Sequence, residues 1–317
     1  YIGKVNIAGK VNTITGLIDY KINTDEKEYI FDIDGSYNYK DSIGNAMNTR
    51  IITEKLNLNI LEPFLGSVFN QINGTAKGDI VISGSGKNMT IIGDVLVDTG
   101  SIKVAFTQCR YIFSYETISF GKDVIDFGIL KIQDTLKNTG SIGGKLYHKF
   151  FQDFRFENVR VETGKMLLLN TTKKDNSQFY GTVIGNALMT MNGPITNLKM
   201  NIDGQPSAID SSHIYLNTDV SGKENSDIDY IDFIQFGSEM DKQILGNKAT
   251  DIEVNMSITA NPACKVDVIL DEETGDIIKG QGMGTLKIKV GSTEPLSIRG
   301  RYEITKGEYT FNFQTWI

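Results

Sequence analysis

Apolar and polar residues alternate one by one along much of the chain, and this period of two constrains the fold more than any other feature. It is clear over 198–202 (Leu-Lys-Met-Asn-Ile) and over 252–258 (Ile-Glu-Val-Asn-Met-Ser-Ile). Successive side chains of a β-strand point to opposite faces of the sheet, so this alternation predicts strands with one apolar and one wet face. Strands buried on both faces would read as continuous apolar runs. The sequence therefore predicts an all-β protein.

Glycine-containing turn signals separate these runs, for example at 77–79, 99–101 and 162–164. The chain has 32 Gly and only 5 Pro, which favours frequent tight turns. Strand and turn recur without a fixed length, as in sheets that grow strand by strand. We therefore predict one elongated, curled β-sheet over residues 1–317. It would form an open, solenoid-like β-groove with an apolar interior, and 222–248 is a candidate hinge.

One stretch departs from the period of two. Around Pro63 the apolar residues follow helical spacing, and proline is well tolerated in the first turn of a helix. The sequence predicts one short amphipathic helix near 60–71, with its apolar face formed by Ile60, Phe64, Leu65, Val68 and Phe69.

Charge and motif content argue against several classes of function. The net charge of −7 and the pI near 5.1 give no basic surface for nucleic acid. Cys109 and Cys264 lie outside any metal-ligand spacing, and the sequence leaves open whether they pair. His148 and His213 belong to no local catalytic signature. We therefore predict no catalytic residue, no metal and no cofactor, and expect that the protein is not an enzyme.

Two glycine-rich segments come close to nucleotide-binding motifs. The segment 83–88 lacks the Ser or Thr that should follow the Lys of a phosphate-binding loop, and 280–284 lies between strand-like runs. Both are better explained as turns or close backbone approaches.

No run of 18 apolar residues is present, so the sequence predicts no membrane-spanning helix. The chain begins and ends within strand-like patterns. We therefore expect it to be a piece of a longer protein.

Three groups of segments carry a family resemblance: 58–64 with 74–84, 170–182 with 191–194, and 271–282 with 300–311. In this order they resemble the C-terminal conserved region of the TamB family, in its Bacteroidetes-type form, among the AsmA-like, bridge-like lipid transfer proteins. The family pattern normally continues past the last strand, so the resemblance implies that a final segment lies outside this chain.

The resemblance implies a lengthwise-curled sheet, a "β-taco", that binds phospholipid acyl chains in its trough. It implies a periplasmic location, with an inner-membrane anchor in an N-terminal segment absent from this chain. It also implies an outer-membrane barrel partner of the TamA or BamA type. The expected role is in outer-membrane biogenesis, as a conduit that carries phospholipid between the two membranes.

The candidate lipid-binding residues are the apolar members of the alternating runs, and ordinary core is the alternative for each of them. A scaffold for outer-membrane protein assembly and secretion, and a polysaccharide-active solenoid, stay open as alternative functions. The predicted groove lining comprises Ile80, Ile82, Val95, Val97, Leu198, Met200, Ile202, Ile252, Val254, Met256, Ile258, Val266, Val268, Leu270, Leu286, Ile288, Val290, Tyr309, Phe311 and Phe313.

Overall fold

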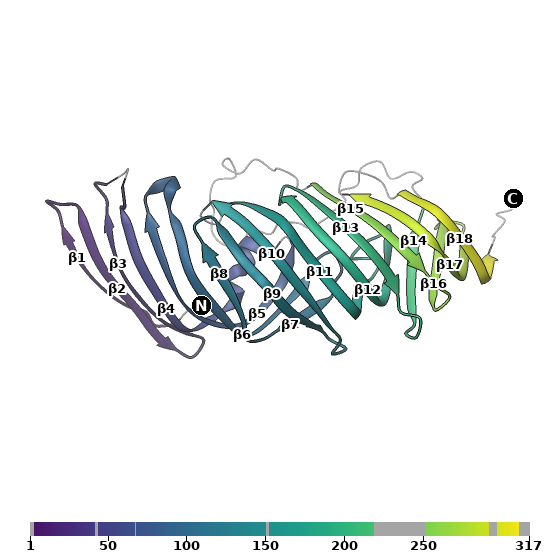
Figure 1. Ribbon diagram of the computed structural model, residues 1–317, viewed down its shortest axis with the longest axis horizontal. Coiled ribbons are helices and arrows are strands. Elements are labelled where there is room, and N and C mark those ends of the chain that lie inside the picture. The colour runs from purple at the N-terminus through teal and green to yellow at the C-terminus, as the bar shows by residue number, and fades with distance from the viewer. Residues whose placement is uncertain are drawn as a thin grey trace.

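The computed structural model of the protein describes residues 3–41, 44–66, 68–149, 152–218, 251–291 and 297–310. Its strands belong to a single sheet of 18 strands. The molecule is elongated along the direction in which strands are added, with β1 at one end and β18 at the other (Figure 1). The all-β class is therefore confirmed.

The N-terminal strands are β1 (Asn6–Asn12), β2 (Leu17–Glu26), β3 (Tyr29–Asn38), β4 (Met47–Asn57), β5 (Phe69–Gly84), β6 (Thr90–Val104), β7 (Arg110–Phe113), β8 (Glu116–Gly121) and β9 (Val124–Asp134). The C-terminal strands are β10 (Thr139–Lys149), β11 (Gln152–Thr171), β12 (Phe179–Pro194), β13 (Asn197–Pro206), β14 (Ser212–Asn217), β15 (Asp251–Ala260), β16 (Cys264–Asp271), β17 (Asp276–Gly291) and β18 (Ser297–Thr310).

Neighbouring strands mostly pair antiparallel and in chain order, because short turns join them. At three places two short strands together occupy the position of one strand. β7 and β8 both pair with β6 and with β9. β13 and β14 share β12, while β15 and β16 share β17.

Two parallel ladders interrupt this pattern. β13 pairs with β15, and β14 with β16, both in parallel. Parallel strands need a long connection, and here β14 ends at Asn217 while β15 begins at Asp251. The candidate hinge at 222–248 falls within this interval and lies outside the described residues.

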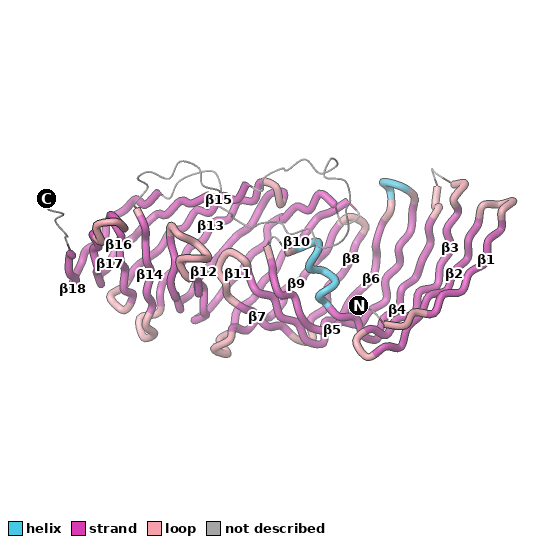
Figure 2. The backbone as a smooth tube through the Cα atoms, turned by 180° about the vertical axis from the view of Figure 1, so that it is seen from behind, coloured by secondary structure: helices cyan, strands magenta, loops and turns pink. Residues whose placement is uncertain are grey.

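The helix predicted near 60–71 is wrong in extent. A 3-10 turn, η1 (Leu58–Leu61), leads into a single α-helical turn, α1 (Glu62–Leu65), and Phe69 already begins β5. The predicted apolar face is also wrong in part, because Ile60 is 43% exposed and the leucines Leu58, Leu61 and Leu65 pack on the interior instead. Figure 2 shows the segment near the middle of the molecule.

The buried core is concentrated in the C-terminal half. A large cluster combines residues of β9 to β17, among them Phe156 and Leu169 of β11. Between these two residues the ladder of β11 and β12 shifts register, and such bulges bend strands. Phe106, in the loop after β6, also reaches Phe179 of β12, with ring centroids 5.6 Å apart. The side of the bent sheet around β6 thus packs against the side around β12. These two sides are called its arms below.

The expectation of a groove that is open throughout is therefore wrong for the C-terminal half. There the interior closes around its own side chains. The physical reason is that β11 is bent and that the strands from β11 onward are rich in large apolar residues. Their two arms meet and exclude water from the space between them.

Candidate functional site

An apolar row crosses the N-terminal half on the interior face of the sheet. Ile22 of β2 pairs with Ile33 of β3, which pairs with Ile51 of β4, which in turn pairs with Ile80 of β5. Ile7 of β1 extends the row beyond Ile22. Residues directly opposite in a ladder lie on the same face, so these five isoleucines form one continuous line across the strands, here called the N-terminal row.

The N-terminal row continues into the closed half, and its members become more buried along the way. After Gly93 of β6, the ladder leads through Phe120 and Ile125 to Leu146 and Phe156. Ile7 is 73% exposed, whereas Phe156 is 2% exposed. Ile22, Ile33, Ile51 and Ile80 are half-buried and belong to neither buried cluster. The same face is therefore accessible over β2–β5 and sealed from β9 onward.

A second line, here called the C-terminal row, crosses β9, β10, β11, β12, β13, β15, β17 and β18. At a spacing of ~4.8 Å per strand it spans about 34 Å. All its members are aliphatic or methionine: Leu130, Ile142, Val161, Met189, Ile202, Met256, Ile288 and Ile298.

The exterior face carries the opposite chemistry. Arg50 of β4 forms a bidentate ion pair with Asp79 of β5, and the guanidinium holds the pKa of the Asp79 carboxyl below its usual range. Lys145 pairs with Asp126 at 3.2 Å. Such exposed pairs keep the outer surface hydrated and contribute little to stability. The sheet therefore has one wet and one apolar face, as the alternation predicted.

Most of the predicted lining residues lie on the interior face. Val97, Leu198, Val254 and Val290 are at most 2% exposed, and Met200 and Val266 are 8% exposed. The following are half-buried: Ile80, Ile82, Val95, Ile202, Ile252, Met256, Ile258, Val268, Leu286 and Ile288. The structure thus brings these residues together on one face, and lipid contact stays a prediction for each.

Four predicted lining residues stand apart. Leu270 lies at a register shift near the end of β16 and is 39% exposed. Tyr309, near the end of β18, is 56% exposed. Neither residue belongs to a buried cluster or packs against one. Phe311 and Phe313 lie outside the described residues.

The centre of the interior consists of residues outside the predicted lining. Ile125, Leu146, Phe156, Val159 and Met191 are all buried there. The alternation over 154–156 and 159–161 is a sequence signal for this buried part of β11. The bulges of β10 and β11 break the period between these short stretches and weaken it.

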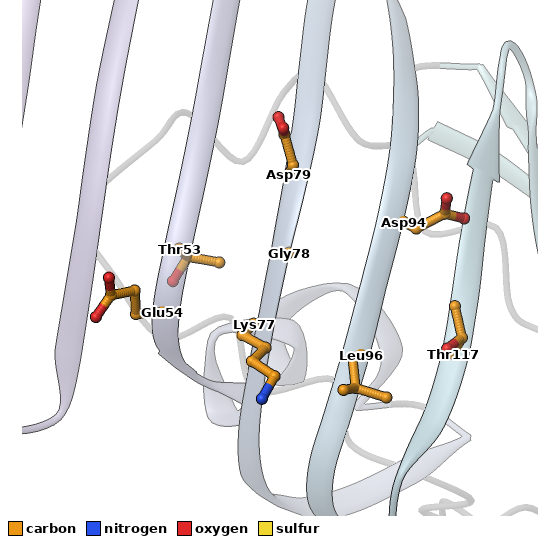
Figure 3. Close-up of a pocket in the computed structure, with 8 residues that line it drawn as sticks. All are labelled: Thr53, Glu54, Lys77, Gly78, Asp79, Asp94, Leu96 and Thr117. Atoms are coloured by element: carbon orange, nitrogen blue, oxygen red, sulfur yellow. The ribbon is translucent and has the colours of Figure 1, made fainter.

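Two surface hollows of the described residues lie away from the predicted lining. The larger, of about 670 Å³, is bordered mainly by polar residues of β4, β5, β6 and β8, including Lys77, Asp79 and Asp94 (Figure 3). The other, of about 550 Å³, is bordered by residues such as Lys173, Tyr180 and His213. Neither is an apolar cavity of the kind that acyl chains fill.

The described residues provide little reactive chemistry. Within them, no group of three or more His, Cys, Asp or Glu is placed to hold a metal ion. Cys109 and Cys264 are both free and buried, so they do not pair with each other. Burial raises the pKa of each thiol to about 11. No described helix is both long enough and apolar enough to cross a bilayer.

This combination defines an all-β protein whose distinguishing feature is a curled sheet with an extended apolar interior. The TamB C-terminal domain model matches residues 128–315, more than half of the chain. The chain belongs to the TamB family. At the family level this assigns it to a translocation and assembly module or to lipid transport, in a family that works with an outer-membrane partner and is not known for enzymatic activity. No curated protein and no solved structure shows a significant match.

Proposed function

We propose that this chain carries phospholipid along the apolar interior of its sheet, as part of a conduit between the inner and outer membranes that supports outer-membrane biogenesis. The protein would act in the periplasm, anchored to the inner membrane through a segment outside this chain. An outer-membrane barrel of the TamA or BamA type would receive its cargo. Phospholipid acyl chains are the proposed ligand.

The observation that carries the proposal is the N-terminal row. Ile22, Ile33, Ile51 and Ile80 form a line of aliphatic side chains on one face, and each remains half-accessible. Monomeric soluble proteins rarely leave contiguous apolar faces without a covering partner or ligand. Moving one CH₂ group from water to such a face is worth ~0.8 kcal/mol, so an acyl chain would be held firmly.

The geometry of the row also supports movement along it. Successive isoleucines repeat at the strand spacing of ~4.8 Å and present similar apolar surfaces. An acyl chain bound there has closely similar positions one strand away, and aliphatic side chains impose no hydrogen bonds that would have to break. The polar head group would stay in water outside the apolar face, since its burial without partners is costly.

The proposal is tested with two adjacent substitutions on opposite faces. Ile51→Asp places a carboxylate in the N-terminal row, and Ile52→Asp places one on the exterior, where Ile52 is already 44% exposed. Each protein is purified and analysed by native mass spectrometry and by lipid extraction, with circular dichroism to check that it is folded. We expect phospholipid on the wild type and on Ile52→Asp, and its loss from Ile51→Asp.

Equal lipid content in both folded variants would contradict a role for this face. A folded wild type that carries no phospholipid, and takes none up from vesicles, would contradict the proposal as a whole.

A second function is favoured by the exposed strand β1. All seven residues of β1 are exposed, and among the described strands it pairs only with β2. Such an edge can pair with an incoming strand, so the chain could instead serve as a scaffold for outer-membrane protein assembly and secretion. This function predicts sensitivity to a proline in β1 and tolerance of Ile51→Asp. The lipid function predicts the reverse.

A further inference from the structure

Methionines gather at one place in the interior of the closed half. Met191 of β12 pairs directly with Met200 of β13. Two residues away on the same strands, Met189 of β12 pairs with Ile202 of β13, which pairs with Met256 of β15. These four residues, here called the methionine patch, are close to half of the nine methionines in the chain.

The methionine patch lies where the interior is sealed. Met191 is 4% and Met200 is 8% exposed, while Met189 and Met256 are half-buried and pack against the same large cluster. Val254, which pairs with Met200, is 1% exposed. Side chains of the protein itself therefore occupy the space that an acyl chain would need.

The side chains of the two halves differ in stiffness. The accessible N-terminal row consists of isoleucine, a β-branched residue with restricted rotation about χ1. Methionine is unbranched, has three rotatable bonds and fills irregular gaps with little preference among shapes. The accessible row thus contains only stiff side chains, whereas the closed half, which also contains β-branched residues, has adaptable side chains at the methionine patch.

We infer that the methionine patch is an expandable binding site for a single acyl chain. The four methionine side chains change rotamer and admit the chain between the two packed arms of the C-terminal half. The inference rests on the proposed lipid function and adds a site, since it places cargo in a region with no preformed opening. It also means that the closed half would bind the acyl chain as the chain moves along the sheet.

The surroundings of the patch define the occupant. The C-terminal row, which contains Met189 and Met256, has no side chain that could donate or accept a strong hydrogen bond. Its length of about 34 Å exceeds one leaflet's acyl chain, which fills about half of a ~30 Å hydrocarbon core. A linear apolar ligand therefore fits this row, whereas a sugar or peptide would leave its polar groups without partners.

The test uses the full chain labelled with ¹³C at the methionine ε-methyl groups and titrated with monomeric palmitoyl lysophosphatidylcholine. We expect the methyl signals of the four patch methionines to shift. Met283 is the internal control, because it is 50% exposed on the exterior face. Met47 reports on the open half, because it lies in β4 on the same face as Ile51.

The outcomes separate this inference from the proposed function. Shifts at Met47 with none in the patch would leave the proposed function standing and overturn the expandable site. The absence of binding by any signal, together with a wild type free of phospholipid, would overturn both.

A variant pair sharpens the test. Met189→Ile with Met256→Ile stiffens the patch while keeping it apolar, and Met47→Ile with Met283→Ile is the matched control. We expect the first pair to weaken the patch response roughly fivefold to tenfold, with the Met47 shift retained, and the control pair to leave the patch unchanged. An unchanged patch response in the folded first variant would overturn the role of methionine flexibility.

Discussion

Ile51 and Ile52 are consecutive residues of β4, yet each has neighbours of opposite chemistry. Ile51 pairs with Ile33 and Ile80, whereas Ile52 pairs with Asp32 and Asp79. Because side chains alternate between faces, a shift of one residue in this ladder would exchange the two environments and bury carboxylates against isoleucine. The contrast therefore specifies both the register and the apolar face.

The first prediction concerns that accessible face. We expect the native protein to bind the dye ANS, because the isoleucines of the N-terminal row are half-accessible. Ile80→Asp should reduce the fluorescence clearly, since it puts a charge within the row. Val81→Asp is the matched control on the exterior, where Val81 is 37% exposed, and should leave the signal unchanged. Equal effects of the two substitutions would argue against a one-sided apolar face.

The second prediction concerns the sealed half. Leu198 is 1% exposed within the large cluster, so Leu198→Ala should lower the free energy of unfolding by about 2–5 kcal/mol. Leu270→Ala, at a 39% exposed position, should change it by no more than about 0.5 kcal/mol. Urea denaturation followed by circular dichroism measures both. A similar, small effect for the two variants would mean that the arms are not tightly packed.

A third prediction follows from a buried carboxylate. Asp134 is 1% exposed and accepts hydrogen bonds from the backbone amides of Leu136 and Asn138 in the turn after β9, and from that of Leu167 in β11. Asp134→Ala would leave the buried amide of Leu167 without this partner, and would remove the same acceptor from two part-buried amides of the turn. Because an unpaired buried donor costs about 1–3 kcal/mol, we expect a loss of at least ~1 kcal/mol in urea denaturation.

Asp123→Ala serves as the control for Asp134→Ala, because Asp123 is exposed in the turn between β8 and β9. It should have little effect. A near-neutral Asp134→Ala would contradict the role of that carboxylate in joining the turn to β11.

The fourth prediction concerns pH. Burial raises the pKa of Cys109 and Cys264 from 9.0 to about 11. A group whose pKa is raised on folding stabilises the folded state fully below the unfolded pKa, and this contribution is lost as the pH rises toward the folded value. Between about pH 9 and 11, the wild type should therefore lose more stability than a Cys109→Ala, Cys264→Ala variant.

The same burial makes both thiols unreactive. We expect slow modification by iodoacetamide at pH 8 in the native protein and rapid modification in urea, followed by mass spectrometry. Rapid labelling of the native protein would contradict the burial of these side chains.

The alternation predicted the all-β class and much of the interior face, because both depend on the local period of two. Leu198, Val254 and Val290 are buried where the pattern placed them. The sequence could not predict which strands would pair. The parallel ladder between Leu198 and Ile252 joins residues more than fifty positions apart and has no local signal.

The sequence pattern also could not predict that the C-terminal half closes. A one-sided apolar strand looks the same whether its face meets another arm of the sheet or remains accessible. Leu270 illustrates a different limit, because a register shift between Ile269 and Asp271 ends the alternation that placed it in the lining. The helical spacing near Pro63 predicted the position of a turn and overestimated its length, because Phe69, counted in that spacing, already belongs to β5.

The strand-by-strand construction has a consequence for how the molecule would come apart. Over β1–β5 each strand is held mainly by its two neighbours, as in repeat proteins, so opening can begin at β1 and proceed inward in small steps. In the C-terminal half, contacts between arms tie distant strands into one cooperative unit. Amide hydrogen exchange should therefore show a graded protection profile from β1 to β5 and a single, uniform level across β11, β12 and β15.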